Sequence, residues 1–264
     1  MDAKIKNNKR GQVTIFIIIA ILIIAVILLF LLLRGDREPN TGGKPTANPE
    51  SFLDSCLKDS IRDAINDLGA EGGFMEHNVY LQFKFTDEAE ARDIEYLCYQ
   101  KNYYLPCVNQ EPMLFHHLEG QIGDLIEEDI WGCWDSLGKS LEKGGYVVDA
   151  RRRGFDIVLE ENRVFVVIDG TIILTKSGET SKEEKFRVGL SSNLYGLIKI
   201  TQEIVSSEAY YCDFDYVNYM LVDPEWSIEK FTSGKGTSIY TITHRETNEK
   251  FRFAIRGCVS PPGY

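Results

Sequence analysis

The side chains that could carry out chemistry are few, and their spacing fits no catalytic or metal-binding pattern. His116 and His117 are neighbours on a predicted helix, where their side chains point about 100° apart and cannot share a metal ion. Glu127, Glu128 and Asp129 are also consecutive, whereas acid/base catalysis requires two carboxylates that converge across a cleft. We therefore interpret the histidines as structural and the acidic run as part of a solvated surface.

Two further segments are similar to functional motifs without matching them. Residues 233–238 read SGKGTS, but they do not satisfy the GxxxxGKS or GxxxxGKT pattern, and a predicted strand follows where a phosphate loop needs a helix. We interpret this segment as the approach to a hairpin. Arg151, Arg152 and Arg153 form a basic run in an acidic region. We expect them in a turn between strands or, alternatively, paired with acidic neighbours in an assembly.

The chain contains no HExxH, GxSxG or CxxC motif. The sequence therefore indicates neither a zinc site, nor the nucleophile of a serine hydrolase, nor a thioredoxin-like redox pair. We expect a non-catalytic protein that holds no metal and no other cofactor. Catalytic groups that lie far apart in the sequence escape such a search, so a surface hydrolase stays as an alternative.

The cysteines are even in number, which favours disulfide bonds in an oxidising compartment. The six are Cys56, Cys98, Cys107, Cys133, Cys212 and Cys258. Six cysteines allow 15 pairings, and the sequence alone selects none of them. Our guess is Cys98–Cys107, which closes a short loop, Cys56–Cys133 between two predicted helices, and Cys212–Cys258 within the C-terminal part. Buried free thiols are the alternative, because cysteine is among the most buried residue types.

Tyrosines are concentrated around the short loop that the pairing Cys98–Cys107 would close. Tyr96, Tyr99, Tyr103 and Tyr104 lie between or beside Cys98 and Cys107. Aromatic side chains on surface loops are enriched at recognition sites. We predict a surface loop and consider it a possible recognition site, with ordinary exposed tyrosines as the alternative.

These groups follow a long apolar segment, Val13–Leu33, which contains no charged residue. As a helix its 21 residues would be roughly 31 Å long, which matches the hydrocarbon core of a bilayer. Basic side chains precede it, at Lys4, Lys6, Lys9 and Arg10, and charges of mixed sign follow it. Because basic flanks stay in the cytoplasm, we predict an uncleaved signal-anchor with residues 1–12 inside the cell and residues 34–264 outside.

The charge balance excludes one class of partner for the outer part. The whole chain has a net charge of −11, and residues 1–34 hold five basic residues and one acidic residue. The remaining residues carry 24 basic and 39 acidic side chains, a net charge of −15. A nucleic-acid-binding domain needs a basic surface, and anionic lipid repels a negative one. We therefore expect no nucleic acid as partner, and contact with the bilayer through Val13–Leu33 alone.

The start of the apolar segment resembles a known family. Residues 10–16, RGQVTIF, are similar to the start of archaeal type IV pilin precursors with a class III signal peptide. In that family a peptidase cuts before a Gln that opens the apolar helix, which here implies cleavage between Gly11 and Gln12. Thr14 stands where the family has Ser, and Phe16 replaces the Glu of the fifth mature position. The resemblance implies a subunit that assembles into a filament through its apolar helix.

A second resemblance covers more of the chain. The opening GQVTIFIIIAI and residues 51–74 are similar to membrane-anchored surface proteins of unknown function from small-genome archaea. This likeness implies a single-pass anchor and no particular activity. We expect either an unknown extracellular partner or self-assembly.

The elements that must position these residues begin after a spacer. Residues 34–50 are rich in Pro and Gly and contain no large apolar side chain, so we predict a flexible spacer. Asn48 is the expected N-cap of an amphipathic helix that ends at Gly69 as C-cap. A strand is predicted at Val79–Phe85, and a second helix at Pro112–Leu141 with a break near Asp129.

The second half of the chain has the period of strands. We predict short strands at 146–148, 155–159, 163–168, 171–175 and 185–190, turns at 161–162 and 177–179, and a helix at 192–206. A last hairpin joins residues 238–244 to 250–256, with Arg252 facing outward. Short connections between consecutive strands indicate antiparallel pairing. The predicted fold class is α+β, with a helical part at about 51–143 and a strand-rich part at about 144–264.

Together these observations predict a cell-membrane protein with one transmembrane helix and an extracellular domain at 51–264. The leading function is a non-catalytic recognition or structural module displayed at the cell surface. The first alternative is a pilin-like filament subunit processed between Gly11 and Gln12, and the second is a surface hydrolase.

Overall fold

The computed structural model describes Ile23 and residues 48–86, 88–102, 104–233 and 236–257. The chain divides into two compact units, residues 1–47 and 48–264. In the first unit Ile23 is helical and exposed. Apart from Ile23, the predicted membrane helix Val13–Leu33 lies outside the described residues, as does the possible processing site at Gly11 and Gln12. Within the described part of the chain, no helix is long and apolar enough to cross a membrane.

The second unit begins with the helix α2, Pro49–Ala70, which has the predicted N-cap. The side chain of Asn48 accepts a hydrogen bond from the backbone N–H of Ser51 at 3.1 Å. Gly69, however, lies inside the helix and is not its C-cap. A Cβ atom at Gly69 would collide with the carbonyl oxygen of Lys250, so glycine is needed there for the close approach of two backbones.

The second long helix, α3, runs without interruption from Leu114 to Lys143. The predicted break near Asp129 is wrong. The three carboxylates at 127–129 are exposed, and the buried face continues past them through Ile126, Ile130 and Cys133. The acidic run therefore lies on the solvent-exposed face of one continuous amphipathic helix. Leu125, which we expected in the core, is 37% exposed.

Three long antiparallel strands form the first sheet, in the order β4–β5–β6: Val147–Glu160, Arg163–Lys176 and Glu179–Ser191. The predicted short strands are pieces of these three, because bulges near Gly154 and Gly170 interrupt the alternation of apolar residues. Both turns lie where the sequence predicts them. Asn162, Ser177 and Gly178 have positive φ angles of 62°, 54° and 84°, as tight hairpin turns require.

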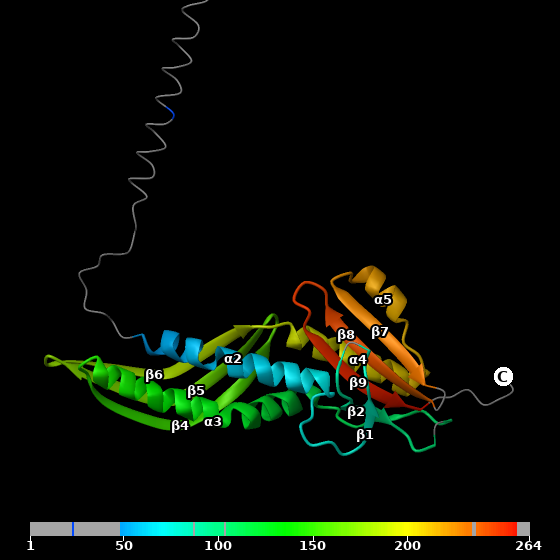
Figure 1. The fold of residues 1–264 in the computed structure, drawn as a ribbon, viewed down its shortest axis with the longest axis horizontal. Helices are drawn as coiled ribbons and strands as arrows, with labels where there is room; N and C mark the ends of the chain where they lie inside the picture. Colours follow the sequence, from blue (N-terminus) through cyan, green and yellow to red (C-terminus); the bar gives the residue numbers. More distant parts are fainter. Residues whose placement is uncertain (1–22, 24–47, 87, 103, 234–235, 258–264) are drawn as a thin grey trace, which may run out of the picture. The chain divides into compact units, whose positions relative to one another are not determined.

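Helices α2 and α3 lie side by side across one face of this sheet (Figure 1). Trp134 of α3 packs its indole over Gly170 of β5 and meets Phe186 of β6 edge-on, with ring centroids 5.3 Å apart. Both Trp134 and Phe186 are buried. The core of this half therefore lies between the helix pair and the sheet.

A second sheet has the order β1–β2–β9–β8–β7, with β3 paired to β2. The strands are β1 Tyr80–Phe83, β2 Arg92–Tyr99, β3 Val108–Asn109, β7 Trp226–Ser233, β8 Thr237–His244 and β9 Lys250–Arg256. The expectation of purely antiparallel pairing is wrong at one place, because β2 and β9 are parallel. The long connection between these strands permits it, since parallel neighbours need a crossover.

The central position of β9 also corrects the predicted orientation of Arg252. Arg252 is 4% exposed, although we expected it in solvent. Phe251 and Phe253 pack on one side of the strand, and the ring of Phe85 covers the Arg252 guanidinium on the other, 3.9 Å away. Glu88 forms an ion pair with Arg252. Both faces of β9 are therefore covered. Its sequence alternates between apolar and charged residues, and this alternation led us to place the buried Arg252 on a solvent-exposed face.

Two further helices complete the unit: α4, Leu194–Tyr211, and α5, Tyr216–Val222. The first extends the helix predicted at 192–206, whereas α5 and β7 were not predicted. Helix α4 contacts β8 and β9, and α5 lies along β7 (Figure 1).

Disulfide bonds join the elements at the predicted places. Cys56 of α2 is bonded to Cys133 of α3, and Cys98 of β2 to Cys107 before β3, so these two pairings are confirmed. Cys212 is also disulfide-bonded, and its predicted partner Cys258 lies outside the described residues. No cysteine in the described part of the chain is a free thiol.

Candidate functional site

The tyrosines do not assemble into the predicted surface loop. Tyr96 is 6% exposed in β2, and its hydroxyl lies 3.2 Å from Oγ1 of Thr237. The prediction is wrong for this residue because β2 pairs with β9 inside the sheet. Tyr99 is half-buried against the Tyr96 ring, and Tyr104 is 56% exposed. Tyr103 lies outside the described residues, and of the other three only Tyr104 is exposed.

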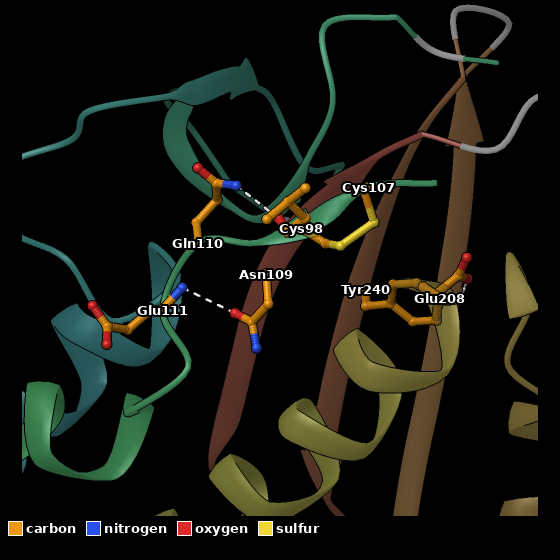
Figure 2. The surroundings of a disulfide bond; sticks show 8 residues. Cys98, Cys107, Asn109, Gln110, Glu111, Glu208 and Tyr240 are labelled. Atoms are coloured by element: carbon orange, nitrogen blue, oxygen red, sulfur yellow. Dashed lines mark hydrogen bonds between the residues drawn. A yellow bond between two sulfur atoms is a disulfide. The ribbon is translucent and has the colours of Figure 1, made fainter. Parts of the chain in front are cut away.

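The disulfide beside these tyrosines has structural surroundings. Figure 2 shows Cys98 and Cys107 next to the strand β3, where the Gln110 amide donates to the backbone carbonyl of Val108 at 2.7 Å. The Asn109 side chain accepts from the backbone N–H of Glu111 at 2.9 Å. Both cysteines are buried. These contacts fix the backbone of a tight connection.

A buried polar cluster lies behind the same disulfide (Figure 2). The hydroxyl of Tyr240 donates to the carboxylate of Glu208, which also accepts from Nζ of Lys230 at 2.7 Å. Burial raises the pKa of Tyr240 far above its ordinary value, and the hydrogen bond to Glu208 adds to this effect. Since each polar group has a partner within the cluster, we interpret it as a structural link between α4 and the second sheet.

Of the two histidines on α3, His117 packs inside the fold and His116 does not. Nε2 of His117 lies 2.9 Å from the carbonyl oxygen of Gly73, and its ring packs on Phe74. His116 points to solvent, with 81% of its side chain exposed. The two residues do not converge on one point, as their adjacency on a helix predicts.

The arginine run lies within β4 and not in a turn, so that expectation is wrong. Arg151 pairs with Asp149 at 2.7 Å, and Arg153 pairs with Asp169 at 2.6 Å. The guanidinium of Arg152 lies over the ring of Trp131, 5.2 Å from its centroid. The run therefore finds its partners inside the chain. Of residues 233–238, Ser233 ends β7 and Thr237 begins β8, while 234–235 lie outside the described residues.

Polar side chains converge instead in a pocket of about 570 Å³ where the two sheets meet. We call it the junction pocket. Its walls come from the β4–β5 turn, the first turns of α4, the end of α5, the start of β7 and the β8–β9 turn. The lining residues are Glu161, Asn162, Ser191, Asn193, Tyr195, Gly196, Lys199, Ile200, Tyr219, Asp223, Glu225, Trp226, His244, Glu246 and Thr247.

A hydrogen-bond network orders the floor of the junction pocket. Glu249 accepts from the backbone N–H of Asn193 at 2.7 Å and from its side-chain amide at 3.0 Å, which attaches α4 to the β8–β9 turn. Nδ1 of His244 accepts from the backbone N–H of Thr247 at 3.3 Å. The amide of Asn193 lies 3.2 Å from the same nitrogen. Since Nδ1 accepts from the backbone of Thr247, the ring carries its proton on Nε2.

The remaining edge of His244 faces a different environment. Its ring meets the indole of Trp226 edge-on, with centroids 4.9 Å apart, and 7% of the residue is exposed. Among the described residues Nε2 has no hydrogen-bond partner. An imidazole whose Nε2 carries a proton at a pocket can donate a hydrogen bond to a ligand there.

The charged residues that line the junction pocket are mainly acidic. Four carboxylates line it, at Glu161, Asp223, Glu225 and Glu246, against one lysine, Lys199. Tyr219 shows the effect, because its pKa is raised to about 12 by burial and, further, by the charges of Glu203, Asp223 and Glu225. The pocket is thus suited to hold a positive charge.

The hydroxyl of Thr247 is engaged within the hydrogen-bond network of the pocket. The hydroxyl of Thr247 lies on the Nδ1 side of His244 and donates to Glu249 at 3.0 Å, so it is not poised as a nucleophile. Nowhere in the described chain do three or more His, Cys, Asp or Glu side chains gather as metal ligands.

Sequence reasoning did not find this site. Asn193 lies 51 residues before His244 and 56 residues before Glu249, and each has an ordinary local context. The one available signal was the segment 213–225, which combines four acidic residues with three aromatic ones and holds no basic residue. A comparison of the chain with models of protein families and with curated proteins finds no match. The site must therefore be interpreted from its own chemistry.

Proposed function

We propose that the chain is a single-pass cell-surface protein whose outer domain recognises a positively charged ligand through the junction pocket. The observation that carries the proposal is the excess of carboxylates around Tyr219 in a pocket of about 570 Å³. Pockets of a few hundred Å³ with a few convergent polar groups are the usual form of small-ligand sites. A primary amine or guanidinium fits the charge of the walls.

The proposed location has two supports. The apolar segment 13–33 has the length and flanking charges of a membrane anchor. The disulfides Cys56–Cys133 and Cys98–Cys107 suit an oxidising compartment outside the cytoplasm. Both supports agree on an outer position for residues 48–264.

The binding proposal is tested with the full-length protein in neutral-lipid nanodiscs. We expect spermidine and agmatine to bind in titration calorimetry, and succinate not to bind. The double variant Asp223→Asn/Glu225→Gln should weaken binding of both cations at least tenfold, because it removes two of the four carboxylates from the walls. Binding of succinate in place of the cations would contradict the proposal.

A matched control separates the pocket from the general negative charge of the chain. Glu229 is an exposed acid on β7 and does not line the junction pocket. The variant Glu229→Gln should bind spermidine as the unaltered protein does. An equal loss in this control would mean that long-range charge, and not the site, attracts the cation.

A pilin-like filament subunit is the second candidate, favoured by the residues RGQVTIF at 10–16. In this case residues 1–11 would be removed and the apolar helix would assemble with those of other copies. The Pro- and Gly-rich segment 34–50 counts against it, because it separates the apolar segment from α2. The two candidates differ in the mass of the mature chain.

A further inference from the structure

An apolar surface is exposed at the end of α4 and on α5. We call it the α5 surface and define it by Tyr210, Tyr211, Val217, Leu221 and Val222, which are 79%, 73%, 54%, 77% and 79% exposed. Helix α5 has no buried residue. Single apolar residues on a surface are ordinary, but a cluster with this exposure marks an interaction site.

The fold holds this apolar side outward by specific contacts. Asp215 caps α5 by accepting from the backbone N–H of Asn218 at 3.0 Å. The hydroxyl of Ser207 donates to the carbonyl oxygen of Asp213 at 2.6 Å, which ties the connection to α4. Met220 lies against β7, its sulfur 3.1 Å from the backbone nitrogen of Ile228. Contacts of Asp215, Ser207 and Met220 therefore hold α5 in place. The exposed apolar side chains of α5 take no part in these contacts.

The rim of the α5 surface is acidic. Residues 200–229 contain seven carboxylates and no Lys, Arg or His. One of them, Glu208, is buried against Lys230, whereas Glu203, Asp213 and Asp215 are exposed. An apolar centre with a negative rim is complementary to a partner that has apolar side chains flanked by positive charges.

A shallow groove adjoins the two exposed tyrosines. It has a volume of about 600 Å³ and runs along α4, and its lining residues are Lys199, Gln202, Glu203, Ser206, Ser207, Tyr210 and Tyr211. Lys199 lies at its far end from the tyrosines in the sequence of α4, so the acidic rim is the part next to α5. Tyrosine rings in such a position can pack on aliphatic side chains and attract ammonium or guanidinium groups through their faces. The groove therefore offers room for side chains from a docked segment.

We propose that the α5 surface docks a basic amphipathic segment of another protein, with apolar side chains on α5 and Lys or Arg against the acidic rim. A second copy is disfavoured, because the part after residue 34 carries a net charge of −15 and would place acid against acid. Anionic lipid is disfavoured for the same reason. This inference rests on the proposed recognition function, but it does not depend on the junction pocket.

The first experiment uses two model peptides on the full-length protein in neutral-lipid nanodiscs. One is an 18-residue helix of Leu and Lys with an apolar stripe, and the other has Glu in place of every Lys. Fluorescence anisotropy should show binding of the Leu–Lys peptide that weakens as salt rises, because the acidic rim contributes. Equal binding of the Leu–Glu peptide would overturn the charge argument.

Variants locate the binding. Leu221→Ser/Val222→Ser should weaken the Leu–Lys peptide at least tenfold without lowering the Tm, because both side chains are exposed. Val147→Ser is the matched control, since Val147 is 73% exposed at the start of β4, and it should change nothing. Unaltered peptide binding in the double variant would overturn the proposal.

Two other occupants have their own outcomes. Self-association of the unaltered protein that Leu221→Ser/Val222→Ser abolishes would identify a second copy as the partner. Deletion of residues 259–264 that raises peptide affinity would identify the chain's own C-terminal residues as the occupant. Either result would overturn docking of another protein.

The same variants keep this proposal separate from the pocket proposal. Leu221→Ser/Val222→Ser should bind spermidine as before, because neither residue lines the junction pocket. If this double variant loses peptide binding but keeps spermidine binding, the α5 surface is supported as the docking site of the peptide. A protein that binds spermidine but never the Leu–Lys peptide would overturn this inference alone, and the reverse would overturn the pocket proposal alone.

Discussion

Tyr219 is the side chain whose ionisation reports the charge of the junction pocket. Burial is the largest cause of its raised pKa of about 12, and Glu203, Asp223 and Glu225 add to it. We expect the variant Asp223→Asn to lower this pKa and the control Glu229→Gln to leave it unchanged. The measurement is the phenolate absorbance of each protein minus that of its Tyr219→Phe counterpart between pH 9 and about pH 13.

The same shift predicts how stability depends on pH. In the unfolded chain the phenol ionises near its ordinary pKa of 10.0, and in the folded chain near about 12. The unfolded state therefore loses its proton first, so the contribution of Tyr219 is complete below pH 10 and is lost as the pH rises through about 12. If Tyr219→Phe unfolds with the same alkaline pH dependence as the unaltered protein, this assignment is wrong.

His244 and Arg252 show what local sequence leaves open for single residues. Each has the context of a surface strand, yet each is more than nine-tenths buried. Arg252 is buried because Phe85 and Glu88, from a distant connection, cover it. His244 is buried because Asn193 and Trp226 meet it from α4 and β7. Such partners belong to other elements, so a one-dimensional pattern does not contain them.

At the scale of elements, the close contact between α3 and β5 requires a glycine, Gly170, which has no side chain. A Cβ atom at Gly170 would collide with the indole of Trp134, whereas a Cβ atom at Gly154 would meet nothing within 4 Å. Both glycines lie at the bulge where β4 and β5 change register. Gly170→Ala should lower the free energy of unfolding by about 1–3 kcal/mol through overpacking, and Gly154→Ala should have little effect.

Chemical denaturation of both variants in urea tests this prediction. The midpoint should fall for Gly170→Ala while the slope of unfolding stays the same, because the change affects packing and not the extent of the fold. Equal stability of the two variants would mean that Trp134 has another position available. The helix α3 would then be less tightly fixed on the sheet than its burial indicates.

At the scale of the whole molecule, the position of the mature chain relative to the membrane is the main prediction. We expect protein purified from its own membranes to have the full-length mass, with residues 1–11 retained. Intact mass spectrometry with and without reductant measures both the length and the disulfides, since each bridge adds about 2 Da on reduction. We expect bridges at Cys56–Cys133, Cys98–Cys107 and Cys212.

A mass that lacks residues 1–11 would favour the filament subunit over a permanent anchor. No mass gain on reduction would contradict the proposed outer location, because the cysteines would then be thiols. The two results are independent, so the same spectrum tests the processing site and the compartment.

Much of the local structure could be predicted from the sequence. The cap at Asn48, the turns at Asn162 and Gly178, the helical period of α2 and α3, and the pairings of Cys56 and Cys98 were all predicted correctly. These features depend on interactions between near neighbours, or on periods of 3.6 and 2 residues that a chain shows directly. The disulfide pairings differ from the other features, because they were guessed from a short loop and from two expected helices and were not selected by the sequence.

Only the tertiary structure determined the rest. The parallel pairing of β2 with β9, the burial of Tyr96 and Arg252, and the junction pocket all arise where segments more than fifty residues apart meet. The free energy of such contacts comes from burying surfaces that a sequence does not show to be adjacent. Asn193 and Glu249 form one hydrogen-bonded site because α4 and the β8–β9 turn pack together, and no pattern in either segment alone indicates it.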